Sequence, residues 1–187
     1  MPSTTWSAQA DPNHLHFITA SALRRVDLFH RDVIKRILVD SLNIGRILGQ
    51  YDLFAFVIMP NHVHLIVRCL DGNKPADVVR EFKKATANLI LRHYEGEENH
   101  RALAFCASGV KRREKQRYAI WNDEYQAKDV FSLAFLRQKI EYIHNNPVQP
   151  HWQLVDEPHR YLWSSARFYL TGGRALIPLS DAGELLA

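Results

Sequence analysis

The stretch from Leu53 to Arg68 constrains the fold of this chain more than any other part of the sequence. Residues 53–59 form an apolar run of β-type side chains, Pro60-Asn61 interrupts it, and residues 62–68 resume it with alternating character. Two antiparallel strands joined by a tight turn fit this pattern best. The apolar run is far too short to cross a bilayer, which needs about 20 apolar residues.

Further strands and helices are predicted on both sides of this hairpin. Loose alternation favours strands, apolar side chains at three- and four-residue steps favour helices, and Pro147 ends the last helix and is expected to push Asn146 out of helical geometry. The predicted strands cover residues 14–20 and 118–121, and the predicted helices cover residues 32–48, 75–94 and 129–146. Residues 95–117 carry little periodicity and are expected to form mainly a long irregular loop, in which residues 102–105 could be ordered.

This order of elements indicates an α+β fold, a ferredoxin-like or RRM-like antiparallel sheet with two helices on one face. The helix that contains Tyr142 is then an additional, C-terminal element. A length of 187 residues fits one compact domain with additions, preceded by a flexible arm over residues 1–13. The two cysteines, Cys69 and Cys106, form no metal-ligand pair by spacing. A soluble protein of a reducing cytoplasm is therefore expected.

Two histidines of the hairpin are candidate metal ligands. His62 and His64 are two residues apart on a predicted strand, so both side chains point to one face. A divalent cation is served well by two neutral imidazoles. The pair alone is also compatible with a plain sheet surface. A catalytic metal needs a third protein ligand from elsewhere in the chain.

Tyr142 is a candidate nucleophile. At about 100° per residue, Leu136, Ile140 and Ile143 form an apolar stripe, and Tyr142 falls at about 200° from Ile140, on the opposite side of the helix. A phenol, with a pKa near 10, attacks a phosphate only when the developing charge is stabilised. Asn146, one turn further along, could bind the same metal through its amide oxygen. A packing role for the tyrosine ring remains open.

Basic residues gather in two places that are candidates for phosphate contact. The formal net charge of +4 says only that an anionic partner is tolerable. A dense run of cations near residue 114 is equally compatible with a solvated loop. The candidate DNA-binding residues are Arg80, Lys83 and Lys84 on one helix, and Lys111, Arg112, Arg113, Lys115 and Arg117 in the run.

Two motifs resemble those of the HUH single-tyrosine transposases. They are Met59-Pro-Asn-His-Val-His-Leu-Ile-Val67 and Tyr142-Ile-His-Asn-Asn-Pro-Val148. The later Tyr161-Leu-Trp-Ser-Ser stretch resembles the REP-associated tyrosine transposases, a branch of this IS200-like family that also tends to carry Asn at the position of Asn146. Gln149-Pro150 departs from the family, where a basic residue followed by Ala is usual. The likeness runs from about His14 to Tyr169.

The resemblance implies a catalytic domain over residues 14–150 and a C-terminal extension over residues 151–187. It implies metal ligation by His62, His64 and Asn146, and attack by Tyr142 on single-stranded DNA beside a hairpin, such as a REP-like palindrome. The product is a 5′-phosphotyrosine link that is rejoined without a nucleotide cofactor. Mg²⁺ or Mn²⁺ suits this chemistry, although ligand softness also admits zinc. A bacterial, nucleoid-associated protein with no membrane partner, either monomer or homodimer, is expected.

Two other functions fit the same residues. A non-catalytic regulator on the same fold would bind hairpin DNA through its basic surfaces alone. A metal-dependent hydrolase acting through water would cut DNA without becoming attached to it. Covalent capture of DNA separates the strand transferase from both alternatives.

Overall fold

The computed structural model describes residues 15–110, 116–180 and 182 of the chain. Four strands, β1 (Leu15–Ala22), β2 (Tyr51–Ile58), β3 (His62–Cys69) and β4 (Trp121–Val130), form one sheet in the order β2-β3-β1-β4, and all neighbours are antiparallel. The α-helices are α1 (Asp32–Ile47), α2 (Pro75–Gly96), α3 (His100–Ser108), α4 (Leu133–Asn145) and α5 (Ala166–Thr171). Short 3-10 helices occupy Leu23–Arg25, Asn146–Val148 and Pro158–Arg160.

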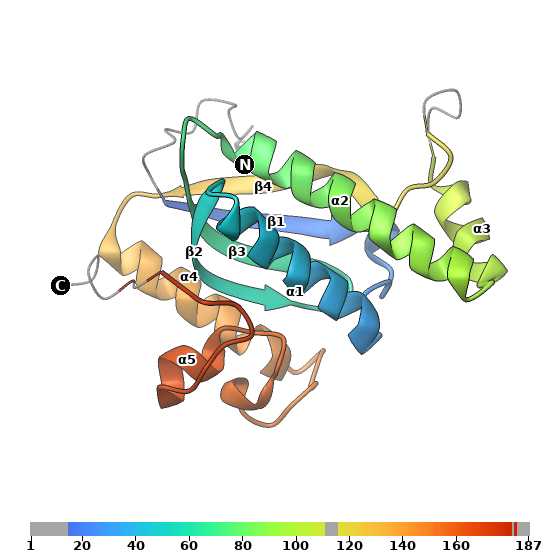
Figure 1. Cartoon of the computed structure of the whole chain (residues 1–187). Coiled ribbons are helices and arrows are strands. Elements are labelled where there is room, and N and C mark those ends of the chain that lie inside the picture. Colours follow the sequence, from blue (N-terminus) through green and yellow to red (C-terminus); the bar gives the residue numbers. More distant parts are fainter. Residues whose placement is uncertain (1–14, 111–115, 181, 183–187) are drawn as a thin grey trace, which may run out of the picture.

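Helices cover both faces of this sheet. In Figure 1, α1 and α2 lie side by side across one face, whereas α4 and the C-terminal elements lie on the opposite side. The predicted α+β fold, with two helices on one face and an additional helix carrying Tyr142, is confirmed. Within the described residues, none of the helices has the length and apolar content needed to cross a membrane.

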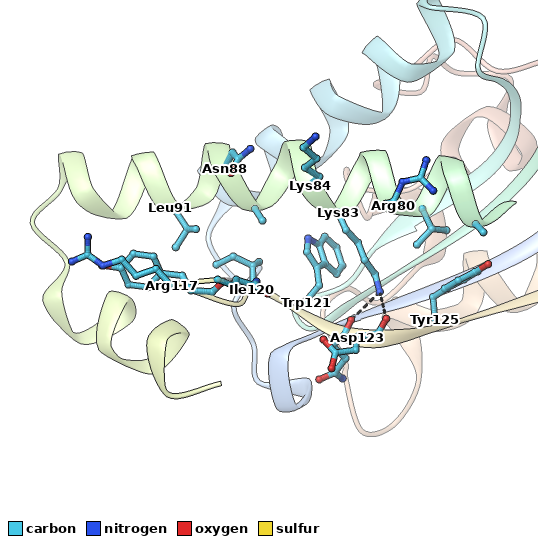
Figure 2. Close-up of a pocket in the computed structure, with 16 residues that line it drawn as sticks. Arg80, Lys83, Lys84, Asn88, Leu91, Arg117, Ile120, Trp121, Asp123 and Tyr125 are labelled. Atoms are coloured by element: carbon cyan, nitrogen blue, oxygen red, sulfur yellow. Dashed lines mark hydrogen bonds between the residues drawn. The ribbon is translucent and has the colours of Figure 1, made fainter. Parts of the chain in front are cut away.

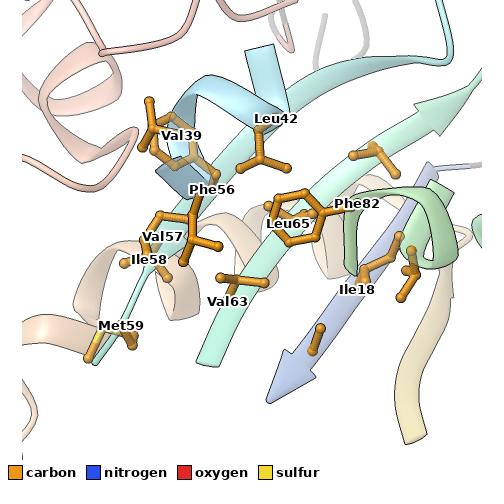
Figure 3. Close-up of a cluster of buried hydrophobic side chains, with 14 of the residues drawn as sticks. Ile18, Val39, Leu42, Phe56, Val57, Ile58, Met59, Val63, Leu65 and Phe82 are labelled. Carbon is orange, nitrogen blue, oxygen red and sulfur yellow. The ribbon is translucent and has the colours of Figure 1, made fainter. Parts of the chain in front are cut away.

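The main core fills the space between the sheet and the first helix pair. Side chains from β1, β2, β3, α1 and α2 meet there, as Figure 3 shows. Ile18, Leu42, Val63 and Leu65 are at most 2% exposed. Alternate residues of β1 and β3 point into this core, so the residues between them, including Thr19, His62 and His64, belong to the face covered by α4.

The C-terminal segment covers the outer edge of β2. Ser164 forms a bridge with Val57, the Ile58 amide donates to the Trp163 carbonyl (2.8 Å), and the Ser165 amide donates to the Phe56 carbonyl (2.9 Å). An uncovered strand edge would offer a row of unpaired backbone groups to another chain. The stretch around Trp163 therefore completes the sheet, and Trp163 itself is buried.

Three local predictions need correction. The fourth strand covers Trp121–Val130 instead of residues 118–121, because it is an edge strand whose polar residues face solvent and hide the alternation. The following helix begins at Leu133 instead of residue 129, where the side chain of the N-cap Ser132 accepts from the Phe135 amide. The expected long loop contains helix α3. Its N-cap, Asn99, marks the start of this helix although the apolar periodicity is weak.

The other helices agree with prediction to within about two residues at each end. The expected arm over residues 1–13 and the cations Lys111, Arg112, Arg113 and Lys115 lie outside the described residues.

Candidate functional site

His62 and His64 lie side by side on the α4 face of β3. Their ring centroids are 4.6 Å apart, with the ring planes at 70°. The Nδ1 atom of His64 is 2.8 Å from the hydroxyl oxygen of Thr19, its partner across the β1–β3 pair. When Nδ1 donates to this hydroxyl, the lone pair of Nε2 is free, and in the described structure that buried atom has no hydrogen-bond partner. His64 thus presents an oriented, unused nitrogen.

His62 is held by amide side chains on two sides. Its Nδ1 atom lies 2.7 Å from the side-chain oxygen of Asn61, which accepts the Nδ1 proton. The His62 imidazole also forms a hydrogen bond with the side chain of Asn146. Burial lowers the pKa of His62 to about 4, with the nearby charge of Arg25 acting in the same direction. Burial, followed by the proximity of His62, holds the pKa of His64 well below its ordinary value. Both imidazoles are therefore neutral at pH 7, the form that binds a metal.

Tyr142 projects from α4 toward the histidine pair. The predicted stripe of Leu136, Ile140 and Ile143 is buried and fixes the rotation of the helix, which leaves Tyr142 48% exposed. Its ring meets that of His64 edge-on, with centroids 5.2 Å apart. The tyrosine on the C-terminal helix and the histidines on the hairpin thus face one another across the sheet–helix interface.

Asn146 completes the cluster, although its backbone differs from expectation. It keeps helical angles (φ −57°, ψ −46°) despite the following Pro147, because the chain tightens there into the 3-10 turn Asn146–Val148. The backbone amide of Asn146 donates to the carbonyl of Ile143, and the residue is only 5% exposed. The last turn therefore carries the Asn146 side chain to His62 instead of into solvent.

The residues present fit a divalent cation held by two imidazoles and an amide. Among the described residues there is no group of three or more His, Cys, Asp or Glu side chains that could hold a metal ion. A metal here would thus depend on a ligand of another type, and the Asn146 amide oxygen is such a group. The buried Nε2 atom of His64, which has no hydrogen-bond partner among the described residues, is the observation that favours this fit.

A cavity of about 760 Å³ opens between the sheet and α4 around these four residues. Three cations that the sequence analysis did not single out, Arg25, Lys128 and Lys139, also line it. The Lys139 ammonium lies 5.4 Å from the centroid of the Tyr142 ring. The sequence could have indicated Lys139, because it lies three residues before Tyr142 on the same predicted helix. Arg25 and Lys128 reach the cavity only through the pairing of the strands, which the sequence does not show. Trp152 is half-buried at the cavity wall.

The predicted DNA-binding residues in the described part of the chain gather in a second cavity. It measures about 650 Å³ and lies between α2 and the start of β4, and Figure 2 shows Arg80, Lys83, Lys84 and Arg117 along it. The Lys83 ammonium donates to the carbonyls of Asn122 (2.8 Å), Asp123 (3.3 Å) and Glu124 (3.1 Å). Lys83 thus ties α2 to β4, and its protons are already engaged.

The other cations of this cavity differ in how far they are engaged. Arg80 is paired with Asp77 (2.8 Å) and Glu81 (3.3 Å). The Arg117 guanidinium lies over the Tyr118 ring, 5.1 Å from its centroid, and Lys84 is exposed. Lys84 and Arg117 are therefore better placed than Arg80 or Lys83 to meet an external phosphate.

Comparisons with known proteins concern the family and the fold of the chain. The model of the family described as "Transposase IS200 like" matches residues 9–146. A solved structure described as a REP-associated tyrosine transposase bound to a REP hairpin has a TM-score of 0.61 at 20% identity, over 90% of this chain and 87% of that one. A crystal structure of a proposed transposase from Deinococcus radiodurans R1 has a TM-score of 0.43 at 21% identity, over 70% of this chain and 90% of that one. No curated protein matches the chain.

Proposed function

The chain belongs to the IS200-like transposase family, and we propose that it cuts and rejoins single-stranded DNA beside a hairpin, with Tyr142 as nucleophile and a divalent metal as cofactor. One observation carries the proposal. The ring of Tyr142 lies 5.2 Å from that of His64, a buried neutral imidazole whose Nε2 atom has no partner in the described structure. A nucleophile and a free metal-ligating nitrogen thus share one cavity.

Three side chains would hold the metal: His62, His64 and Asn146. When bound, Mg²⁺ or Mn²⁺ would polarise a non-bridging phosphate oxygen and orient the phosphate for attack. The side-chain oxygen of Asn61 accepts the Nδ1 proton of His62 and orients its ring. When His64 donates its own Nδ1 proton to Thr19, its Nε2 lone pair stays available. Zinc remains compatible with the two imidazoles, although phosphate oxygens favour the harder ions.

Tyr142 would perform the covalent step. Its hydroxyl oxygen attacks the phosphorus of a phosphodiester and forms a new phosphorus–oxygen bond, while the bond to the 3′ oxygen breaks. The 3′ oxygen leaves as a hydroxyl after taking up a proton, and the 5′ phosphate stays on the tyrosine. Rejoining reverses these changes, so no nucleotide cofactor is required. Lys139, whose ammonium lies over the Tyr142 ring, stabilises negative charge on the phenol oxygen during attack.

Hairpin DNA is the proposed partner. A protein of similar fold is described as bound to a REP hairpin, and this chain offers cations in both cavities for backbone phosphates. We assign catalysis to residues 14–150, and to residues 151–187 the support of the sheet edge and of α4. Ser165 of this extension links α4 to the sheet. Its hydroxyl lies 2.9 Å from the imidazole of His144 on α4 and donates to the Phe56 carbonyl of β2.

Covalent capture tests the proposal. Purified protein with Mn²⁺ or Mg²⁺ is mixed with labelled single-stranded oligonucleotides that carry palindromes from the neighbourhood of the gene, and adducts are resolved by denaturing electrophoresis. We expect an adduct that Tyr142→Phe abolishes and that a chelator prevents. Tyr94→Phe, a tyrosine of α2 that lines neither cavity, is the matched control and retains the adduct. If Tyr142→Phe forms the adduct in undiminished yield, Tyr142 is not the nucleophile.

A second candidate is supported by the separation of the two cavities. Because the cavity between α2 and β4 shares none of the residues His62, His64, Tyr142 and Asn146, a hairpin-binding regulator could use it without any cleavage. That function predicts salt-sensitive DNA binding that His62→Ala and Tyr142→Phe leave unchanged, with no adduct in the wild-type protein. Cleavage without an adduct would instead indicate a hydrolase acting through water.

A further inference from the structure

Two stacked phenylalanine rings stand at the start of α4. Phe131 directly precedes the N-cap residue Ser132, and its ring lies parallel to that of Phe135, with centroids 5.5 Å apart and planes at 11°. Phe131 is 78% exposed, more than any other large hydrophobic side chain in the described part of the chain. One face of its ring rests on Phe135, and most of the remainder meets solvent.

Lys139 connects this pair to the candidate active site. Its ammonium lies 5.0 Å from the centroid of Phe135, 5.0 Å from that of Phe17 and 5.4 Å from that of Tyr142. Phe17 in turn meets the rings of Tyr142 (6.0 Å) and His64 (5.3 Å). A continuous row of ring faces and one cation therefore runs from solvent to the nucleophile.

Packing within the fold does not explain Phe131. Burial of its apolar surface is how a phenylalanine side chain stabilises a fold, and a ring that is 78% exposed forgoes most of this stabilisation. Elsewhere in the described chain, the exposed Phe168 on α5 is 37% exposed and lies against Tyr169. Phe131 exposes about twice that fraction beside a candidate DNA-cleaving site.

We propose that Phe131 and Phe135, with Lys139 beside them, form a stacking platform for an unpaired base of the DNA strand that is cut. The inference rests on the proposed function and extends it to a binding site for the bases next to the scissile phosphate. Flat ring faces stack on any base, and an adjacent ammonium meets the backbone phosphate of the same nucleotide. An apolar protein segment would cover the rings but would leave the ammonium without an anionic partner.

The position of the platform specifies which nucleotides it meets. Phe135 lies seven residues before Tyr142 on the same helix, which at 1.5 Å per residue is about 10 Å along its axis. The stacked base therefore belongs to the first few nucleotides from the scissile phosphate. Since stacking tolerates any base, the platform orders the strand without selecting its sequence.

The experiment uses the full chain carrying Tyr142→Phe, which holds DNA without cutting it. The probe is a hairpin oligonucleotide with single-stranded arms, in which 2-aminopurine replaces each arm base in turn. We expect its fluorescence to be quenched at one or two arm positions. Phe131→Ala and Phe135→Ala abolish this quenching and weaken binding of the armed hairpin by about 5-fold or more, the equivalent of losing at least about 1 kcal/mol of stacking. Phe131→Trp restores both.

Two controls separate stacking from general damage. Phe168→Ala, which removes an exposed ring on α5, leaves quenching and affinity unchanged. A hairpin without arms binds wild type and platform variants equally. Thermal melting shows whether each variant is folded. Because Phe131 is largely exposed, Phe131→Ala is expected to have the same melting temperature as the wild type.

The outcomes distinguish this inference from the proposed function. If wild-type protein forms the covalent adduct but Phe131→Ala and Phe135→Ala bind and quench as before, the platform is wrong and the transferase stands. If quenching depends on Phe131 but no adduct forms, the platform stands as a binding site for an unpaired base and the strand transferase is wrong. A dimer of the free protein that Phe131→Ala dissociates in sedimentation assigns the rings to a second copy of the chain, and overturns the platform.

Discussion

The two faces of the strands β1 and β3 differ in chemistry far more than in burial. Toward α1 and α2 the strands present Ile18, Val63 and Leu65, which are at most 2% exposed. Toward α4 the next residues along are Thr19 and His64, and His64 is only 4% exposed. The leucine needs no partner in the core, whereas the histidine is buried with Nε2 unpaired in the described structure.

The comparison shows that the fold tolerates a local free-energy cost on the face where the candidate metal ligands lie. A buried polar group without a partner costs about 1–3 kcal/mol. The apolar face offsets that cost and also fixes the register, since a slip by one residue would exchange the two sets of side chains. Mutations on the two faces should therefore separate activity from stability.

The largest expected effect is on activity at the polar face. His64→Ala removes a proposed metal ligand that carries little of the core. We expect at least about a 100-fold loss of covalent adduct, because loss of a hydrogen-bond partner of a metal ligand already costs about 10–100-fold. The free energy of unfolding, measured by urea denaturation, should change less than in the substitution of the adjacent Leu65. An adduct that persists in His64→Ala would remove the histidine from the site.

The matched change on the apolar face is Leu65→Ala, one residue along the same strand. Removal of a buried leucine should lower the free energy of unfolding by about 2–5 kcal/mol. At a temperature where the variant is folded, adduct yield per folded molecule should remain within about twofold of wild type. A large loss of adduct in a fully folded sample would contradict the separation of the two faces.

A smaller effect is expected from the residue that orients His64. Thr19→Val keeps the shape of the side chain but removes the hydroxyl 2.8 Å from Nδ1. Loss of such a partner weakens metal affinity by about 10–100-fold, which calorimetric titration with Mn²⁺ measures. Ser21→Ala, a change of another β1 side chain that lines the same cavity, is the control and keeps the wild-type affinity.

Much of this architecture could be predicted from local patterns. The alternation in residues 62–68 placed His62 and His64 on one face, and helical spacing placed Tyr142 opposite the stripe of Leu136 and Ile143. Both inferences depend only on the periods of strand and helix. They identified the components of the site, although not how those components meet.

What the sequence could not provide depends on register and on edges. The pairing of Thr19 with His64 follows from how β1 aligns with β3, and no local pattern encodes that alignment. β4 was misplaced because an edge strand has polar residues where a central strand has apolar ones. Lys83, a candidate for DNA contact, donates to the carbonyls of three consecutive β4 residues, a contact that exists only after the chain has folded.

The central claim is that Tyr142 attacks a phosphodiester under the control of the histidine–asparagine cluster. Its most direct test is mass spectrometry of the protein after reaction with Mn²⁺ and a cleavable hairpin oligonucleotide, followed by nuclease and protease digestion. The proposed mechanism predicts a nucleotide 5′ phosphate on the peptide that contains Tyr142, and its absence when His62 and His64 are replaced. A nucleotide on any other residue, or cleaved DNA with no modified peptide, would contradict the claim.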